Sequence, residues 1–364
     1  MQPVRIVPAN SDTALREFRA VATRIRARHP QSRNTDSTIL EMLLGGRAAY
    51  HQHAQVRPFL LERDGVVGRV LLIHDQNLGQ YVQAGYFVAE PDLFGVRTAI
   101  EEQARQTFPG VPRLVVGLGG HVNHPTGILI DGFDPPAFGY TWNPPYYGAY
   151  FDGLVPHPMV SYRFETAPGY RFVDQLGAAF PPGAVVTRNM DWQQMHREVN
   201  LYTELNNACL GEHPYWSDRR PDEDWELLQP FSQFIGGENL IFAEVGGEAV
   251  GFLLWYPDFN QLIATPEEHL SPRHLLEFRD RNPIRAVRLA AVGVKKEHRG
   301  GLVVPAMLLR MAQSVRKGPY EFCEGGYIFE NNMSSMGMTH KFIQQAFGHE
   351  PKMVRRWAVF EGEL

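Results

Sequence analysis

The chain has 364 residues, of which 44% are hydrophobic and 21% are charged, and its formal net charge is −5. These values are typical of globular proteins and exclude a disordered or low-complexity chain, and the length favours two domains over one. Because the sequence has no apolar run of transmembrane length, no signal-peptide pattern and only two cysteines, we expect a cytoplasmic protein with no membrane partner.

The first half of the chain begins with a helix-prone region at 13–28. A β-hairpin at 59–73 follows, and its turn is Asp64-Gly65. Asp-Gly between two β-rich runs favours a tight hairpin turn. A strand at 81–89 and a helix at 96–107 complete the series.

The second half repeats this order of elements. It has a helix-prone region at 192–210, a hairpin at 241–255 with a Gly-Gly turn, a strand at 287–294 and a helix at 305–315. A single repeat of this size predicts two copies of one α/β domain rather than a solenoid.

The boundary between the copies is predicted from composition. Residues 166–184 are rich in Pro and Gly, which is typical of a linker, although their aromatic side chains indicate that the segment packs. We therefore expect one domain at 1–165, a linker at 166–184 and a second domain at 185–364.

The strand of the second copy ends in a basic turn, Lys295-Lys-Glu-His-Arg299-Gly300-Gly301, and an apolar helical stretch follows. This order brings backbone N–H groups, a helix N-terminus and a guanidinium to one point. Such a point favours a bound anion, and a pyrophosphate fits it.

This turn, the later run Glu324-Gly-Gly-Tyr-Ile-Phe-Glu330-Asn-Asn332, and the closing segment Ala346 to Phe360 resemble the GNAT superfamily of N-acyltransferases, in particular its bacterial tandem members. The resemblance implies two mixed α/β domains, each with a mostly antiparallel twisted sheet flanked by helices. It also implies acetyl-CoA or another acyl-CoA as co-substrate. No metal is expected, because the histidine pairs His51/His53 and His121/His124 have no Cys or acidic residues at metal-ligand spacing. The donor-binding positions that the resemblance implies are Val292, Val294, Arg299, Gly300, Gly301 and Asn332.

Some positions depart from the pattern of the family. Leu302 and Val304 stand where the family's motif has small residues, and their side chains would crowd a pyrophosphate. The last helix, near 340–347, lacks the tyrosine that serves as general acid in many active relatives. The first copy has no Arg-Gly turn and carries Glu90 and Asp92 in its place, so we interpret it as a degenerate, structural or acceptor-shaping domain.

Acyl transfer to an amine needs a base, and the donor strand carries no carboxylate. Glu324 and Glu330 lie six residues apart on a strand-like run, so both point to one face, and Glu324 is the better candidate base because it lies further inside the strand. The alternative is that both are ordinary hydrogen-bonded carboxylates. Cys323 is expected to be buried and inert.

A second set of catalytic candidates lies in the loop after the first helix of the second copy. Glu212, His213 and Tyr215 could supply acid, base or orientation there, because the corresponding loop covers the acceptor pocket in the resembling fold. The alternative is an ordinary surface loop.

The sequence leaves three functions open. The first is transfer of an acyl group from acyl-CoA to a small-molecule or amino-acid-like amine. The second uses an aminoacyl-tRNA or an acyl carrier protein as donor. Residues 285–364 favour this donor because they hold twelve Lys and Arg against seven Asp and Glu, although the overall negative charge disfavours a large RNA surface. The third is a non-catalytic ligand-binding protein. The oligomeric state is not predicted.

Overall fold

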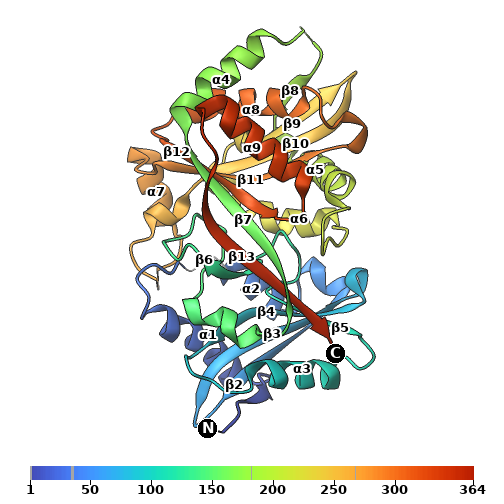
Figure 1. The fold of residues 1–364 in the computed structure, drawn as a ribbon, viewed down its shortest axis with the longest axis vertical. Helices are drawn as coiled ribbons and strands as arrows, with labels where there is room; N and C mark the ends of the chain where they lie inside the picture. The colour runs from blue at the N-terminus through green and yellow to red at the C-terminus, as the bar shows by residue number, and fades with distance from the viewer. Residues whose placement is uncertain (1, 34–36, 182, 267) are drawn as a thin grey trace. The chain divides into compact units, whose positions relative to one another are not determined.

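The computed structural model describes residues 2–33, 37–181, 183–266 and 268–364. The chain forms two compact units (Figure 1). The first contains Met1–Met159, Ile263–His269 and Arg355–Leu364, and the second contains Val160–Leu262 and Leu270–Val354. Each unit is a mixed sheet with helices, as the sequence predicts.

The first unit has the strand order β1-β2-β3-β4-β5-β13, with β6 paired to β13. Its neighbours are antiparallel except for β4 and β5, which are parallel. The elements are β1 (Arg5–Pro8), α1 (Asp12–Arg26), α2 (Ser37–Leu44), β2 (Ala54–Glu62), β3 (Val66–Asp75), β4 (Tyr81–Ala89), α3 (Val96–Thr107), β5 (Arg113–Val116), β6 (Ile128–Asp131), the 3₁₀ helix η3 (Pro145–Phe151) and most of β13 (Lys352–Glu363).

The second unit has the strand order β7-β12-β11-β10-β9-β8. Strands β8 to β11 are antiparallel neighbours, and β11 is parallel to β12. The elements are the end of β7 (Val155–Glu165), α4 (Thr166–Ala178), β8 (Val186–Asn189), α5 (Met195–Leu210), α6 (Pro221–Leu228), β9 (Leu240–Val245), β10 (Glu248–Pro257), α7 (Pro272–Arg281), β11 (Ala286–Val294), the 3₁₀ helix η8 (Lys296–His298), α8 (Val303–Val315), β12 (Phe322–Phe329) and α9 (Met333–Phe347).

The two predicted hairpins are confirmed. Strands β2 and β3 pair around a turn in which Asp64 and Gly65 have positive φ, and β9 and β10 pair around Gly246 and Gly247, which also have positive φ. Positive φ at both central residues matches the right-handed twist of the paired strands, and glycine adopts it without strain. The repeat visible in the sequence is therefore a repeat of structure.

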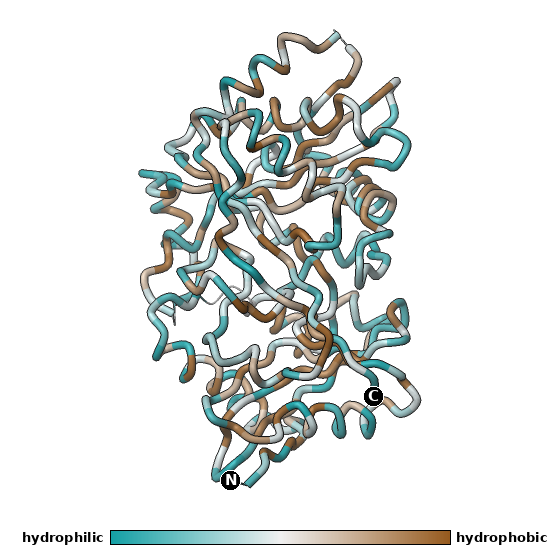
Figure 2. Tube along the Cα trace, viewed as in Figure 1, coloured by the Kyte–Doolittle hydropathy of each residue, from teal (hydrophilic) through white to brown (hydrophobic). Residues whose placement is uncertain are grey.

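Helices cover both faces of the sheet in the second unit. Val303, Met307 and Met311 of α8 pack on one face with Val287 and Cys323, and the buried side of α5 packs on the other face with Phe242 and Phe252. Figure 2 shows apolar residues along the strands and polar residues in many outer turns. This alternation follows from a sheet with two buried faces.

The segment predicted as a linker is largely helical. Helix α4 runs from Thr166 to Ala178, and Pro168 lies in its first turn, where a missing N–H breaks no helical hydrogen bond. A Cβ on Gly177 would lie 2.6 Å from Cδ2 of Leu309, so this glycine permits close contact with α8. Proline and glycine here serve helix entry and packing. Pro182 lies outside the described residues.

The unit boundaries also differ from the predicted ones. Arg355–Leu364, expected in the second domain, lies in the first unit, where β13 pairs with β5 from Phe360↔Val116 to Glu363↔Arg113. Conversely, β7 enters the second unit from Val160 onward. The reason is burial: Trp357 is fully buried, and Ala358 and Phe360 are part of the first unit's core. Within the described residues, no helix is long and apolar enough to cross a membrane.

Candidate functional site

Strand β11 and its parallel neighbour β12 separate partway along their length. Strands β11 and β12 pair in register from Ala286↔Phe322 to Leu289↔Gly325. In the described chain they do not pair beyond this step, although β11 continues to Val294 and β12 to Phe329. Beyond this step, the backbone N–H and C=O groups on this side of β11 are not committed to pairing with β12.

A bulge in β11 lies at the same level. The pairing of β10 with β11 shifts between Leu254↔Ala291 and Trp255↔Leu289, which leaves Ala290 as the extra residue. Bulges bend a strand and change the direction of its side chains, and they are frequent beside active sites. The bulge immediately follows the last paired step with β12, so the strands separate where β11 bends.

The basic turn connects this strand to α8. η8 is followed by Arg299 and then by Gly300, whose φ is 77°. No side chain caps the N-terminus of α8 in the described structure. The first N–H groups of a helix have no partner within it, so those of Val303 and Val304 can receive an anion, whereas Pro305 supplies none.

Arg299 holds the turn together rather than extending away from it. Its Nε donates to the oxygen of Val294 at 3.1 Å, and its Nη2 donates to the oxygen of Cys209 at 2.9 Å. Nη1 lies 3.3 Å from Oε2 of Glu212. Arg299, which the sequence predicts to bind an anion, therefore ties the end of β11 to the end of α5.

Glu212 belongs to this same turn. Its carboxylate lies 2.8 Å from Nζ of Lys296 as well as contacting Arg299. These two cations, the hydrogen bond from Lys296 first, lower the pKa of Glu212 below its ordinary value. A carboxylate with a lowered pKa accepts a proton less readily, which argues against Glu212 as the general base.

His213 and Tyr215 lie beside the end of β12. The ring of His213 is 5.1 Å from that of Phe329, and the ring of Tyr215 is 6.2 Å from it. Burial lowers the pKa of His213. The loop from Glu212 to Tyr215, predicted to cover the acceptor, thus lies against β12. Through the contact of Glu212 with Arg299, this loop also lies beside the basic turn.

Glu324 is buried in β12, one paired step before the strands separate. Its side chain is 4% exposed, and its Oε1 accepts a hydrogen bond from Oγ of Ser161 at 2.8 Å. Arg288 is its register partner on β11. The Arg288 guanidinium lies 5.7 Å from the ring centroids of both Tyr256 and Tyr327. A buried polar cluster therefore marks the point of separation.

The remaining predicted donor residues have internal roles. Val292 and Val294 pair with Leu253 and Gly251 of β10, which positions the open edge of β11. The Asn332 side chain caps α9 by accepting from the N–H of Ser335 at 3.1 Å. Asn332 therefore uses its side-chain oxygen within the fold, and this geometry gives no support to a cofactor contact through that atom.

Sequence reasoning missed Ser161 and the pair Tyr162–His340. Both residues of β7 reach β12 and α9 because β7 enters the second unit, and the Tyr162 hydroxyl lies 3.1 Å from Nε2 of His340. The available signal is the alternation of apolar or aromatic and polar residues at 160–165, which is typical of a strand.

Both cysteines are free and buried. Burial raises the pKa of Cys209 to about 11 and that of Cys323 to about 12, so neither is a thiolate at neutral pH. Among the described residues, no group of three or more His, Cys, Asp or Glu is placed to hold a metal ion.

Comparison with known proteins places this geometry in a known fold. No family model matches the chain. A solved tandem GNAT protein from the clavulanic acid biosynthesis pathway superposes with a TM-score of 0.55 and 14% identity, over 99% of this chain and 98% of that one. A GCN5-related N-acetyltransferase from Sphaerobacter thermophilus gives 0.51 and 12%, over 100% and 97%.

Two curated proteins resemble the sequence along most of its length. A bacterial ceramide synthase from Caulobacter vibrioides is 25% identical over 366 residues, covering 92% of each chain. Protein YghO of Escherichia coli is 21% identical over 326 residues, covering 82% of this chain and 80% of that one. The solved structures confirm the predicted fold class, and the separation of β11 from β12 at a bulge agrees with it. The chain has the fold of the tandem GNAT proteins.

Proposed function

We propose that the protein is an N-acyltransferase whose second unit holds an acyl-CoA thioester and transfers the acyl group to an amine. The observation that carries the proposal is the separation of β11 from β12 after Leu289↔Gly325, next to the uncapped N-terminus of α8. An open strand edge suits a ligand arm with amide groups, and a helix N-terminus suits its phosphates.

An ammonium acceptor loses two protons in this chemistry. A base takes the first, the freed amine nitrogen attacks the thioester carbonyl carbon, the carbon–sulfur bond breaks, and the leaving thiolate of coenzyme A takes up the second proton, which the new amide nitrogen gives up. We propose Glu324 as the base that receives the ammonium proton, directly or through water. Its position beside the point of separation supports this role, and Ser161 fixes one of its oxygens.

The acceptor is proposed from the curated relative. A ceramide is the amide of a fatty acid and a long-chain amino alcohol, and the ceramide synthase of Caulobacter vibrioides aligns with 92% of this chain. We therefore propose an acceptor amine on a long-chain carbon backbone, in place of the small or amino-acid-like amine expected from the sequence.

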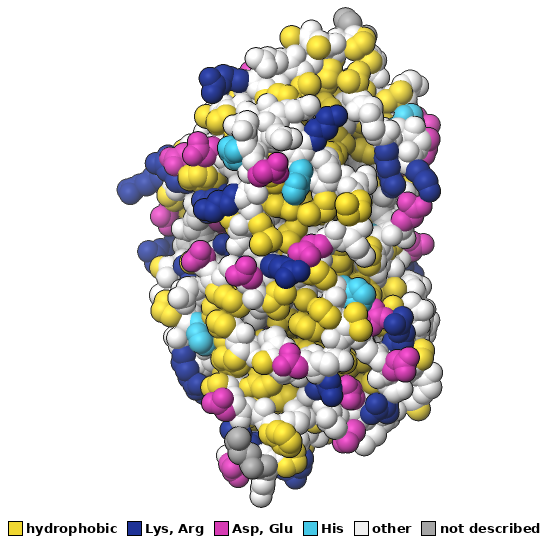
Figure 3. All heavy atoms as spheres, viewed as in Figure 1, with side chains coloured by type: hydrophobic (Ala, Val, Ile, Leu, Met, Phe, Trp, Pro, Cys, Tyr) yellow, Lys and Arg dark blue, Asp and Glu magenta, His cyan; other side chains and the backbone are white. Residues whose placement is uncertain are grey.

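A carrier-protein thioester is the second candidate donor. A carrier's phosphopantetheine has one phosphate diester where coenzyme A has a pyrophosphate, so it needs fewer N–H donors. Pro305 removes one such donor, and Arg299 is already bonded to Val294, Cys209 and Glu212. These observations favour the smaller phosphate group. Figure 3 shows basic and acidic side chains interspersed on the face drawn, which gives no support there to a large tRNA-binding surface.

The test is a matrix of donors and acceptors. Thiol release and amide mass are measured for acetyl-CoA, palmitoyl-CoA and palmitoyl carrier protein, each with sphinganine, octylamine or lysine. We expect release with a long-chain thioester and sphinganine. Release with none of the nine pairs, from protein that melts cooperatively, would contradict the proposal, and release only with the carrier would select the second donor.

A further inference from the structure

A row of polar side chains crosses one face of the sheet in the second unit. Arg288 of β11 is the register partner of Tyr256 on β10 and of Glu324 on β12. The residues just before Arg288 and Glu324, which are Val287 and Cys323, pack against α8. Because successive side chains of a strand point to opposite faces, the row lies on the face that α5 covers. The proposed base therefore faces α5.

Arg219 lies just before α6, and its backbone is fixed to α5. Its N–H donates to Oδ1 of Asn207 at 3.0 Å, and its oxygen accepts from Nδ2 of the same side chain at 2.9 Å. The Arg219 side chain is 1% exposed, and its Nε donates to Oδ1 of Asp224 at 2.7 Å. The other oxygen of Asp224 accepts from Oγ1 of Thr203 at 2.7 Å. Contacts with α5 and α6 together thus hold the guanidinium in place.

Two nitrogens of this guanidinium are not used by the protein. Nη1 and Nη2 of Arg219 are buried, and neither has a hydrogen-bond partner within the described residues. A buried donor that stays unpaired is destabilising, and more so when it belongs to a charged group. Asp224 already balances the charge of Arg219, so a neutral oxygen fits these nitrogens better than a second anion does.

Asn206 offers the complementary group. Its side chain is fully buried, and its Nδ2 donates to the backbone oxygen of Tyr202 at 2.9 Å, whereas its Oδ1 has no partner in the part of the chain that the structure describes. Asn206 lies one turn after Thr203 on the same side of α5, and Thr203 contacts the carboxylate that holds Arg219. A hydroxyl group both accepts and donates, so it matches unpaired donors and an unpaired acceptor together.

Tyr202 connects these residues to the row on the sheet. Burial and then Asp224 raise the pKa of Tyr202, and Tyr256 also acts on it. Tyr202 belongs to the core beneath α5, and Ala291, which directly follows the bulge of β11, packs against that core. The unpaired groups therefore lie on the same face of the sheet as Glu324, near the bend in β11.

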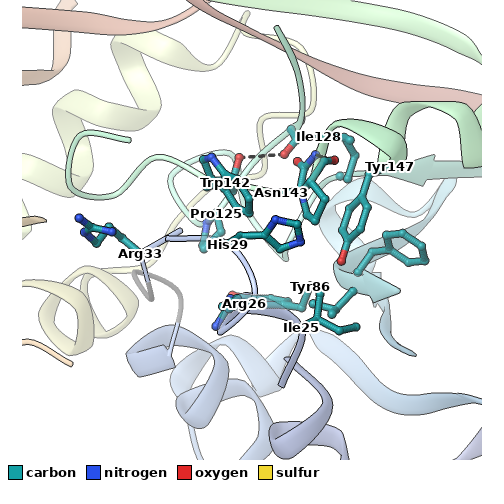
Figure 4. Close-up of a pocket in the computed structure, with 16 residues that line it drawn as sticks. Ile25, Arg26, His29, Arg33, Tyr86, Pro125, Ile128, Trp142, Asn143 and Tyr147 are labelled. Atoms are coloured by element: carbon teal, nitrogen blue, oxygen red, sulfur yellow. Dashed lines mark hydrogen bonds between the residues drawn. The ribbon is translucent and has the colours of Figure 1, made fainter. Parts of the chain in front are cut away.

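The cavity of the first unit is not an alternative place for the acceptor. Its volume is about 70 Å³, which is room for a few water molecules. Figure 4 shows Asn143 among its lining residues. Oδ1 of Asn143 accepts from the N–H of Leu129 at 2.6 Å, and Nδ2 donates to the oxygen of Leu129 at 3.0 Å. This amide is thus already bonded, and the cavity is too small for a long-chain acceptor.

We propose that Arg219 and Asn206 bind a hydroxyl group of the acceptor, so that the second unit takes a long-chain amine with a hydroxyl group near its nitrogen. The inference rests on the proposed function and adds the group by which the acceptor is recognised. An acceptor without the hydroxyl group leaves the buried donors and the buried acceptor unpaired, and it therefore binds more weakly.

The experiment titrates the full chain calorimetrically with two amines of equal chain length, 2-aminododecane-1,3-diol and dodecan-2-amine. We expect the diol to bind about ten- to a hundredfold more tightly, because only the diol supplies the missing hydrogen bonds. Equal affinities would overturn the proposal.

The titration needs no acyl donor, so it separates this proposal from the proposed function. Preference for the diol without acylation of either amine, by palmitoyl-CoA or by palmitoyl carrier protein, would contradict the acyl transfer and support the hydroxyl site. Acylation of both amines at equal affinity would support the transfer and contradict the hydroxyl site.

Two variants and a control locate the site. Arg219→Lys keeps a cation beside Asp224 but removes the forked donors, so we expect the preference for the diol to fall to within about threefold. Asn206→Leu removes the acceptor at similar volume and is expected to weaken diol binding about five- to tenfold. Arg220→Lys, at the exposed neighbouring position, is the matched control and is expected to leave the preference unchanged.

Melting curves check that each variant folds, and Asn206→Leu together with the parent decides the question if Arg219→Lys does not melt cooperatively. An undiminished preference for the diol in the folded variants would mean that the hydroxyl group is bound elsewhere, and it would contradict the assignment.

Discussion

Ser161 donates a hydrogen bond to Glu324 at 2.8 Å, although the two residues are 163 positions apart in the sequence. Both side chains are almost fully buried. The bond joins β7, which begins in the first unit, to β12, at the level where β11 and β12 separate. The proposed base is therefore fixed by a strand that the first half of the sequence supplies.

This bond predicts a kinetic effect at Ser161. Ser161→Ala removes this hydrogen bond to Oε1 of Glu324. We expect turnover to fall about tenfold with the affinity for the acyl donor unchanged, because the bond orients only the carboxylate. Turnover and the dissociation constant of the donor are measured together. Ser161→Thr keeps the hydroxyl and is the control. An equal loss in Ala and Thr variants would mean that the effect is one of packing.

A substitution of Glu324 itself is expected to lower turnover more than one of Ser161. Glu324→Gln keeps size and hydrogen bonding but cannot accept a proton at neutral pH, so we expect turnover to fall by about 10²-fold or more with donor binding nearly intact. The matched control is Glu330→Gln, in the turn directly after β12. Full activity in Glu324→Gln, with the loss appearing in His213→Ala, would move the base to the acceptor loop.

Substitutions of Arg299 and Glu212 are expected to change the affinity for the acyl donor in opposite directions. Arg299→Ala is expected to weaken donor binding by about 1.5–3 kcal/mol and to loosen the turn, because it also bonds Val294 and Cys209. Glu212→Gln removes the competing carboxylate and is expected to tighten binding about two- to fivefold, with the gain reduced by salt. Calorimetric titration of both variants with acyl-CoA checks this, and weaker binding in Glu212→Gln would contradict it.

Burial of His213 predicts a pH effect on stability. Its pKa is lowered in the folded chain, so below the ordinary pKa of histidine the unfolded chain binds a proton that the folded chain resists. Its contribution is therefore present above pH 6.5 and falls as the pH drops below that value. We expect the melting temperature of His213→Gln to decline less between pH 7.5 and 5.5 than that of the parent. His349→Gln, at an exposed position, is the control.

Local patterns explain why much of the fold could be predicted. The β4 range 81–89 and the α3 range 96–107 match the expectation, because strand alternation, helix periodicity and the hairpin turns are written in neighbouring residues. The placement of β13 could not be predicted. An apolar side chain such as Trp357 could be buried in the core of either unit, and only the tertiary fold decides which core it enters.

The sequence predicts the locally encoded part of the candidate site and not its long-range contacts. The turn at Arg299 and Gly300 was identified because consecutive residues build it. The Ser161–Glu324 bond and the Tyr162–His340 contact join segments remote in sequence, and no local pattern encodes them. Arg299 was expected to face an anion, but its bonds to two backbone oxygens depend on where α5 ends, which only the folded chain defines.

A crystal structure of the chain with a non-hydrolysable palmitoyl-CoA thioether tests whether the second unit holds the acyl donor. We expect the pantetheine arm along β11 beyond Leu289 and the phosphates at the turn from Gly300 to Val304. Donor phosphates bound in the first unit, beside Glu90 and the N-terminus of α3, would overturn the proposed donor site.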